Sequence, residues 1–183
     1  KIAIDISIYL YKFLEEDALI DNLYLMIGLF RKYNILPVFV FDGKPPKEKY
    51  AIIEERRDKK KAAKKYYNKL NERLLELKKG TGLKNQEDIY KIQMIMREEY
   101  KKTIRISQEN IKETKQLIKA YGACYLHAEG EADVLCAELV KNKKVYGCLS
   151  EDMDMFVYGC NRIFRGINIY NETLQYYDYV KVL

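Results

Sequence analysis

Short apolar runs alternate with longer segments of helical periodicity along most of this chain. The run from Ile2 to Ile6 predicts a buried strand that ends at Asp5, and Leu36–Phe41 predicts a second, since it is rich in β-branched and aromatic residues. The second run stops at Asp42-Gly43, and Pro45-Pro46 then ends any regular structure. Further strands are expected over Ala123–Leu126, Lys144–Leu149, Arg162–Arg165 and Thr173–Tyr177.

Helical patterns fill the segments between these strands. Ser7–Lys32 has helical periodicity, with a break expected near Glu15–Asp17. Ser107 can cap a helix that runs to Tyr121 and ends at Gly122, and Glu131–Lys141 is also expected to be helical. Strands that alternate with helices predict an α/β domain, with helices flanking a mostly parallel central sheet.

The segment between residues 47 and 106 has a different character. Lys47–Lys79 is charged and low in Gly and Pro, which favours one long helix, and Glu87–Lys102 could form a second helix after a loop at Gly80–Asn85. Between Lys44 and Lys84 there are about fifteen Lys and Arg against about six Asp and Glu. We therefore expect one domain over residues 1–183, with a core of 1–46 and 107–183 and a basic helical insertion over about 47–106.

Composition narrows the possible classes. The chain has 183 residues, 48% of them hydrophobic, and a net charge of +6, a basic excess that suits a polyanionic partner. Its four cysteines form no C-x-x-C pair, so we expect buried thiols in a reducing environment and a structural role for His127. No run is apolar enough to span a bilayer, and no signal peptide is visible. We therefore expect an intracellular protein that is neither secreted nor a membrane protein, with residues before Lys1 missing from this sequence.

Acidic residues follow four of the predicted strands. Asp5 ends the first strand and Asp42 follows the second. The acids after the third and fourth strands are Glu129, Glu131, Asp133, Asp152 and Asp154. Because functional sites in open parallel sheets gather at the carboxyl ends of the strands, these acids are expected to share one crevice.

Such a cluster would need cations or protons. Two carboxylates about 4 Å apart repel each other by roughly 4 kcal/mol at an effective dielectric constant near 20. Oxygen ligands without His or Cys favour Mg²⁺ or Mn²⁺, and two such ions can activate a water and stabilise the leaving oxygen of a phosphodiester. Ordinary helix caps and loop positions are the alternative for any single acid, and a single-metal phosphotransfer site is the alternative for the group.

Three motifs resemble the family of flap endonucleases and xeroderma pigmentosum group G nucleases. The first is Ile4-Asp5 with the following Tyr11, and the second is Val40-Phe41-Asp42-Gly43-Lys44-Pro45-Pro46. The third is Gly130-Glu131-Ala132-Asp133, followed after the right interval by Ser150-Glu151-Asp152-Met153-Asp154. The resemblance runs over nearly the whole chain, and it implies a PIN-like fold in which residues 47–106 form a helical arch.

The resemblance also implies a role for individual residues. Two Mg²⁺ ions, which Mn²⁺ could replace, would be held by Asp5, Asp42, Glu131, Asp133, Asp152 and Asp154. Asp133 departs from the family, where many members have glutamate, and the role of Glu129 stays open. Lys49 and Arg56 match the catalytic basic pair, with a solvated basic helix as the alternative. Tyr11 matches a tyrosine on which a terminal base stacks, with core packing as the alternative, and Lys44 and Arg57 are further candidates for DNA contacts.

The implied activity is that of a structure-specific 5′ nuclease, a flap endonuclease or 5′–3′ exonuclease that acts on DNA in replication and repair. The alternatives are an RNA-directed 5′ nuclease of related fold, a non-catalytic DNA-junction binding module, and a phosphotransfer or phosphatase domain. Family members continue into a helix–two-turn–helix module, which this sequence lacks, and a sliding-clamp peptide would also lie beyond it. The expected location is the nucleus in a eukaryote and the cytoplasm otherwise.

Overall fold

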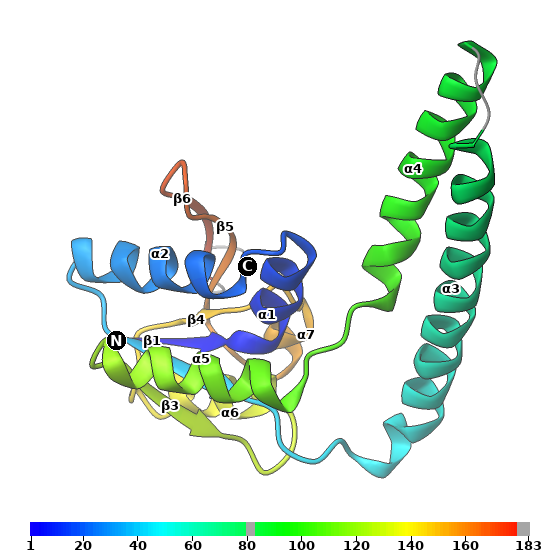
Figure 1. Cartoon of the computed structure of the whole chain (residues 1–183). Helices are drawn as coiled ribbons and strands as arrows, with labels where there is room; N and C mark the ends of the chain where they lie inside the picture. The colour runs from blue at the N-terminus through cyan, green and yellow to red at the C-terminus, as the bar shows by residue number, and fades with distance from the viewer. Residues whose placement is uncertain (80–82, 179–183) are drawn as a thin grey trace. The chain divides into compact units, whose positions relative to one another are not determined.

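The computed structural model describes residues 1–79 and 83–178 (Figure 1). Its six-stranded sheet has the order β3-β2-β1-β4-β5-β6, in which the first five strands are parallel and β6 is antiparallel to β5. The strands are β1 (Ile2–Asp5), β2 (Pro37–Phe41), β3 (Cys124–His127), β4 (Cys148–Leu149), β5 (Arg162–Asn168) and β6 (Thr173–Asp178). The predicted α/β class with a mostly parallel sheet is confirmed.

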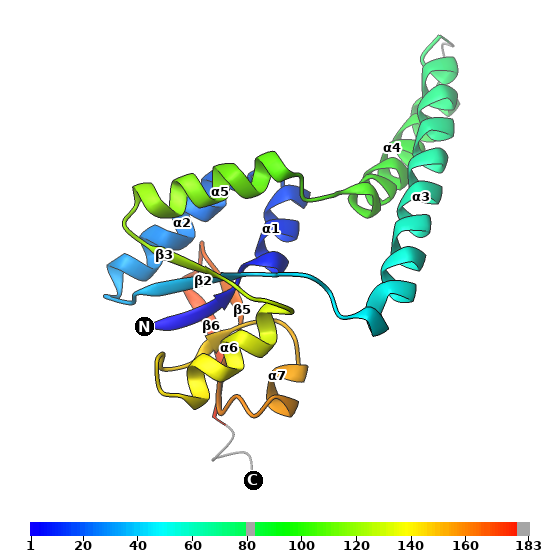
Figure 2. The ribbon, with the colours of Figure 1, turned by 90° about the horizontal axis from the view of Figure 1, so that it is seen from below.

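Helices cover both faces of this sheet (Figure 2). One face carries α1 (Ile6–Glu15), α2 (Leu19–Lys32) and α5 (Gln108–Ala120), and the other carries α6 (Ala132–Lys141) and the short α7 (Asp154–Val157). The predicted break between α1 and α2 is confirmed, and it contains Asp17 with a positive φ of 53°. Ser107 caps α5 as expected, since its hydroxyl accepts a hydrogen bond from the backbone N–H of Asn110 at 3.1 Å.

Alternate residues of the central strands supply the two hydrophobic cores. In β1, Ile4 packs with the α1, α2 and α5 side, whereas Ala3 packs with the α6 side, and Phe39 and Val40 divide in the same way in β2. Side chains of successive strand residues point to opposite faces, so apolar runs without alternation indicate strands buried on both sides. This packing fixes the strand ends at which the acids lie.

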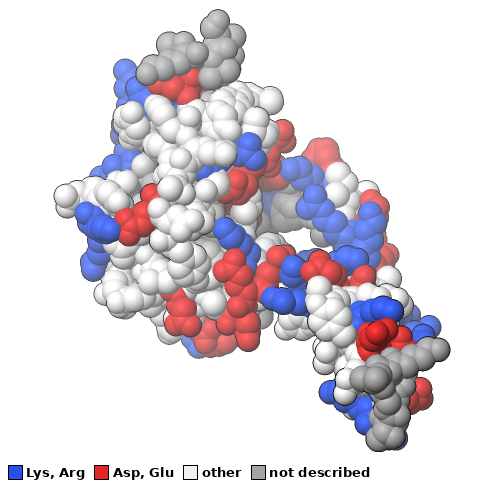
Figure 3. All heavy atoms as spheres, turned by 90° about the horizontal axis from the view of Figure 1, so that it is seen from above, with Lys and Arg blue, Asp and Glu red and all other residues white. Residues whose placement is uncertain are grey.

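Residues 47–105 form a second compact unit, called the arm here. It consists of a 3₁₀ turn, η1 (Lys47–Lys49), followed by α3 (Tyr50–Leu77) and α4 (Leu83–Thr103). Leu70 and Leu74 of α3 pack against Ile92 and Met96 of α4. The other described positions of the arm are mostly exposed, and Lys and Arg side chains are spread over its surface with acids between them (Figure 3).

Several predicted boundaries differ from the structure. The fourth strand was expected over Lys144–Leu149 but comprises two residues, because the backbone N–H groups of Lys144 and Val145 donate to the carbonyl of Leu139 at the end of α6 instead of to a strand. Helix α4 begins at Leu83 rather than Glu87, since no Gly or Pro lies between these two positions to stop it. Part of the expected Gly80–Asn85 loop, residues 80–82, lies outside the described residues. None of the described helices is long and apolar enough to cross a membrane.

The cysteines also differ in part from expectation. Cys136, Cys148 and Cys160 are buried free thiols, as predicted. Cys124 is exposed, because it lies on β3, the edge strand of the sheet, whose residues are exposed or half-buried. An apolar run at a sheet edge cannot be told from a central one by composition.

We predict that Gly43→Ala destabilises the protein, because the added Cβ would lie 2.1 Å from the backbone oxygen of Ala128 and 2.5 Å from that of Glu129. The expected loss is about 1–3 kcal/mol, the usual cost of forcing extra atoms into a packed site. Gly28→Ala is the matched control, since Gly28 lies within α2 with no atom within 4 Å of its added Cβ, so that variant should be about 0.5–1 kcal/mol more stable. Urea unfolding of both variants measures the effect, and equal stabilities would contradict the close approach.

Candidate metal centre

Asp5 lies at the carboxyl end of β1 and begins α1. Its side chain is 5% exposed, and its Oδ1 accepts a hydrogen bond from the backbone N–H of Ser7 at 3.1 Å, which caps the helix. Burial, followed by the negative charges of Asp133 and Asp42, raises the pKa of Asp5 to about 7. The Asp133 carboxyl also acts on Asp5 at short range in the same direction, so these two carboxyls lie close together.

Asp42 follows β2 and connects that strand with the start of α6. Its Oδ1 accepts from the backbone N–H of Ala132 at 2.9 Å, and its Oδ2 accepts from the Ser7 hydroxyl at 2.5 Å. The neighbouring Gly43 N–H donates to the Gly130 carbonyl at 2.7 Å, which fastens the same two segments together. The Asp42 carboxylate therefore sits where the positive end of the α6 dipole favours it.

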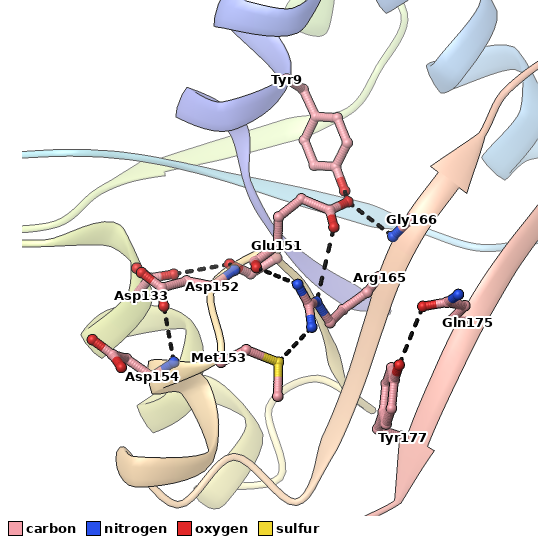
Figure 4. A network of polar contacts seen from close by, with 11 residues as sticks. Tyr9, Asp133, Glu151, Asp152, Met153, Asp154, Arg165, Gly166, Gln175 and Tyr177 are labelled. Carbon is pink, nitrogen blue, oxygen red and sulfur yellow. Dashed lines mark hydrogen bonds and ion pairs between the residues drawn. The ribbon is translucent and has the colours of Figure 1, made fainter.

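Asp133, Ser150 and Asp152 form a continuous set of hydrogen bonds (Figure 4). The buried Ser150 hydroxyl donates to Asp133 Oδ1 at 3.1 Å and accepts from the backbone N–H of Asp152 at 3.1 Å. The backbone N–H of Asp154 then donates to Asp152 Oδ1 at 2.9 Å. Burial raises the pKa of Asp133, and the charges of Asp152, Asp42 and Glu131 raise it further.

The sheet thus gathers acids from separate parts of the chain at one edge. Among the predicted residues, the charges of Asp42 and Asp133 raise the pKa of Asp5. The charges of Asp42, Glu131 and Asp152 raise the pKa of Asp133. Asp154 begins α7, has an exposed side chain, and is joined to the group through its backbone bond to Asp152. The charges that raise the pKa values of Asp5 and Asp133 most are those of other carboxylates.

The chemistry of these side chains fits a hard divalent cation. They offer oxygen atoms in a negatively charged, partly buried place, which suits Mg²⁺ or Mn²⁺. In the described ranges 1–79 and 83–178, no three His, Cys, Asp or Glu side chains are grouped closely enough to hold one metal ion.

Two hollows adjoin this acidic edge. One, of about 740 Å³, is lined by residues that include Lys44, Glu129 and Glu131. The other, of about 360 Å³, is lined by residues that include Asp42 and Tyr11, whose side chain is 40% exposed. Tyr11 is therefore accessible beside an acid of the site, an arrangement that suits the predicted stacking of a base.

His127 lies on β3 and packs against two aromatic rings. Its ring centroid is 5.6 Å from those of Phe41 and Tyr125, and burial together with the charge of Lys115 lowers its pKa. His127 is exposed and lines both hollows, so the structural role expected for it stays a prediction.

Lys49, Arg56 and Arg57 belong to the arm. Lys49 ends η1 and directly precedes α3, Arg56 and Arg57 lie within α3, and all three are exposed. The arm and the sheet domain are separate compact units, so the predicted place of these residues beside the acids stays a prediction.

Other polar residues of the site were not identified from the sequence. Ser7 and Ser150 hold the acids through their hydroxyls, and Glu151 and Arg165 support the segment that carries Asp152. Ser150 and Glu151 lie inside a motif that had been noted for its aspartates. Nothing in the sequence around Arg165 indicated its role, because that role arises from the pairing of β5 beside β4.

Comparisons with known proteins agree with this geometry. The sequence matches the XPG N-terminal domain over residues 1–63 and the XPG I-region over residues 122–183. Flap endonuclease 1 of Glossina morsitans morsitans is 31% identical over an alignment of 201 residues, which covers 100% of this chain and 48% of that protein. Flap endonuclease 1 of Leishmania braziliensis is 38% identical over 136 residues, covering 74% of this chain and 30% of that protein.

Solved structures share the fold. A complex of the catalytic core of Rad2 with DNA substrate has a TM-score of 0.63 at 26% identity, and a second such complex has a TM-score of 0.66 at 24% identity. Each match covers 100% of this chain and 47% of the Rad2 chain. Human GEN1 in complex with Holliday junction DNA has a TM-score of 0.55 at 20% identity.

The fold defines the class, an α/β domain with a mostly parallel sheet and a helical insertion. Within that class, the chain belongs to the family of flap endonucleases and XPG nucleases. It spans about half the length of the curated relatives that it matches.

We predict that the metal-free protein loses stability as the pH rises from about 4 to about 7, and that Asp5→Asn removes much of this loss. Asp5 has a pKa of about 7 in the folded protein, against about 3.9 in an unfolded chain. The folded state therefore holds the proton more tightly, so its advantage is complete below the unfolded pKa and disappears through the folded pKa. Melting temperatures in EDTA between pH 4 and 8 measure the effect.

The control for this pH series is Asp58→Asn, which changes an exposed acid of α3. Its melting temperatures should follow the pH dependence of the unaltered protein. Parallel curves for Asp5→Asn and the unaltered protein would contradict the raised pKa of Asp5.

Proposed function

We propose that this chain carries the nuclease centre of a structure-specific 5′ nuclease that hydrolyses DNA phosphodiesters near junctions of single and double strands. The observation that supports the proposal most is the set of mutually repelling acids at the carboxyl edge of the sheet, on the elements where the family match is found. A module that only binds DNA would have no use for acids that are placed so that they repel one another. Flap removal in replication and repair, or 5′–3′ exonuclease action, is the corresponding role.

Two Mg²⁺ ions, or Mn²⁺ in their place, would supply an activated water and stabilise the leaving oxygen of the phosphodiester. The residues proposed to hold them are Asp5, Asp42, Glu131, Asp133, Asp152 and Asp154. Ser7 and Ser150 keep two of these carboxylates oriented through the hydrogen bonds described above. The charge of the acids also repels a bare phosphate, so substrate approach would depend on cations.

Basic and aromatic residues are proposed to hold the DNA. Lys49 and Arg56 would contact the scissile phosphate and offset the charge that develops in the transition state. Tyr11 would stack on a terminal base, an interaction worth about 1–3 kcal/mol. Lys44, Arg57 and the other basic residues of the arm would contact phosphates without reading the sequence.

The proposed cellular location and further partners follow from this activity. A DNA substrate implies an intracellular protein, in the nucleus if the organism is a eukaryote. A grip on duplex DNA by a helix–two-turn–helix module, and docking to a sliding clamp, are proposals that concern parts of the relatives beyond the matched half.

We predict that Asp152→Ala reduces the Mg²⁺-dependent cleavage of a 5′-flap DNA by at least about 10²–10³-fold, the usual effect of removing one charge-stabilising group. DNA affinity in EDTA should stay within about twofold, because phosphate contacts come from basic residues. Single-turnover cleavage and fluorescence anisotropy measure the two quantities. The control Asp21→Ala alters an exposed acid of α2 and should change neither.

The same assay decides between the alternatives if DNA and RNA flaps are tested side by side. Faster cleavage of the RNA flap by the unaltered protein would replace the DNA assignment with an RNA-directed one. Tight flap binding without cleavage in Mg²⁺ or Mn²⁺ would indicate a binding module. Undiminished cleavage by Asp152→Ala would contradict the assignment of the metal centre.

We predict that Lys49→Ala slows the single-turnover cleavage rate by about 10–100-fold while DNA affinity changes by less than about threefold, because the ammonium group acts mainly on transition-state charge. Lys47→Ala is the matched control for the cleavage rate, since Lys47 is also an exposed lysine of the same 3₁₀ turn. Equal losses of rate and affinity for Lys49→Ala would assign it to phosphate anchoring alone.

A further inference from the structure

The segment that carries Asp152 receives little support from the sheet. Strand β4 contributes two residues, Cys148 and Leu149, to the ladders with β1 and β5, and the backbone N–H of Ser150 makes one more bond to β5, to the carbonyl of Phe164 at 3.2 Å, before the chain leaves the sheet. The next regular element is the four-residue helix α7, which begins at Asp154. Side-chain contacts must therefore fix the segment between Ser150 and Asp154, called the acidic loop here.

Glu151 lies within this loop, but its side chain points away from the acids. In Figure 4 it extends toward Tyr9 and Gly166, on the opposite side from Asp133 and Asp154. Its Oε1 accepts from the Tyr9 hydroxyl at 3.1 Å and from the Gly166 backbone N–H at 2.8 Å. Tyr9 is 1% exposed in α1, and Gly166 lies in β5, so the one carboxylate joins α1 to β5.

Arg165 holds the loop on either side of Asp152. Its Nη2 donates to the backbone oxygen of Glu151 at 2.8 Å, and its Nη1 contacts the sulfur of Met153. Its Nε lies 3.8 Å from Glu151 Oε2, and both side chains are partly buried, with exposures of 24% and 32%. The residues immediately before and after Asp152 are thus both attached to one guanidinium group.

The backbone at Gly166 suits this arrangement. Its φ is +59°, a conformation that side-chain-bearing residues rarely adopt, and it presents the N–H that Glu151 accepts. The Tyr9 hydroxyl stays protonated as a donor, because burial and the Glu151 charge raise the pKa of Tyr9. Each partner of Glu151 is therefore a fixed donor, and the carboxylate is their common acceptor.

We propose that Glu151 is a positioning residue for the metal centre. Together with Tyr9, Gly166 and Arg165 it holds the acidic loop so that Asp152 faces Asp133 instead of solvent. The inference rests on the proposed function, because the ions are what the positioned acids would bind. Glu151 contacts neither metal nor substrate in this role, which separates it from the six acids assigned as ligands.

The role requires the acceptor oxygens of Glu151 rather than its charge. Glu151→Gln keeps an oxygen that can accept from Tyr9 and Gly166, whereas Glu151→Ala removes every side-chain contact. Loss of a group that orients metal ligands typically weakens metal binding by about 10–100-fold. A difference between the two variants therefore distinguishes a positioning residue from a ligand.

The test uses Mn²⁺ as the probe, with its affinity for the whole protein measured by isothermal titration calorimetry. Glu151→Ala should weaken Mn²⁺ binding by about 10–100-fold, whereas Glu151→Gln should stay within about threefold of the unaltered protein. The matched control is Glu172→Ala, which also removes a glutamate that accepts from a tyrosine hydroxyl (Tyr33) and a cation (Lys32) but lies in the β5–β6 turn. It should leave Mn²⁺ affinity unchanged.

Two results would overturn the proposal. Equal losses for Glu151→Gln and Glu151→Ala would show that the charge is essential and that the acceptor oxygen alone does not position the loop, and unchanged affinity in Glu151→Ala would remove its role altogether. If Glu151→Ala does not fold, Tyr9→Phe decides, because it deletes one donor from a residue outside the loop. Weaker Mn²⁺ binding with a retained circular dichroism spectrum supports the proposal, and unchanged binding contradicts it.

The results distinguish a failure of the positioning role from a failure of the proposed nuclease function. If the unaltered protein binds no Mn²⁺ and cleaves no flap, the nuclease proposal fails. If it does both and Glu151→Ala equals it, only the positioning role fails. DNA affinity in EDTA should be the same for Glu151→Ala, Glu151→Gln and the unaltered protein, since none of the proposed phosphate contacts lies in the acidic loop.

Discussion

The repulsion between carboxylates at one edge of the sheet is the constraint on which the site depends. Parallel strands end on the same side, so Asp5, Asp42 and the loop after β4 deliver negative charge to a common place. Water solvates such charges well, but Asp5 is buried and Asp133 is half-buried. The protein can keep these carboxyls together only if protons or cations neutralise part of the charge. The raised pKa of Asp5 means that, without a cation, this carboxyl keeps its proton to a higher pH.

The rest of the domain resists this repulsion with directional contacts. Ser7 and Ser150 each donate to an acid, the α6 N-terminus donates to Asp42, and the Glu151–Arg165 group holds the loop from behind. These contacts come from the strand ends and first helical turns rather than from the centre of the core. These contacts restrict the positions of the acidic side chains, and a bound ion would stabilise the folded state further by mass action.

The sequence predicted the site best where an acidic residue directly follows an apolar run with the pattern of a strand. Asp5 and Asp42 could be placed at strand ends because each follows a buried apolar run, and the two-sided burial of β1 and β2 follows from runs without alternation. The length of β4 could not be predicted, since it depends on the backbone bonds that Lys144 and Val145 make to the end of α6. The exposure of Cys124 depends on strand order, and the roles of Glu151 and Arg165 depend on contacts between segments that are not adjacent in the sequence.

The central claim is that the acidic edge binds divalent cations, and the most direct test is to locate Mn²⁺ by anomalous scattering in crystals of the whole protein. The account predicts peaks at the carboxyl ends of β1, β2 and β4, with oxygens of residues such as Asp133 and Asp152 as ligands. Mn²⁺ bound only elsewhere, or none at this edge at millimolar concentration, would contradict it.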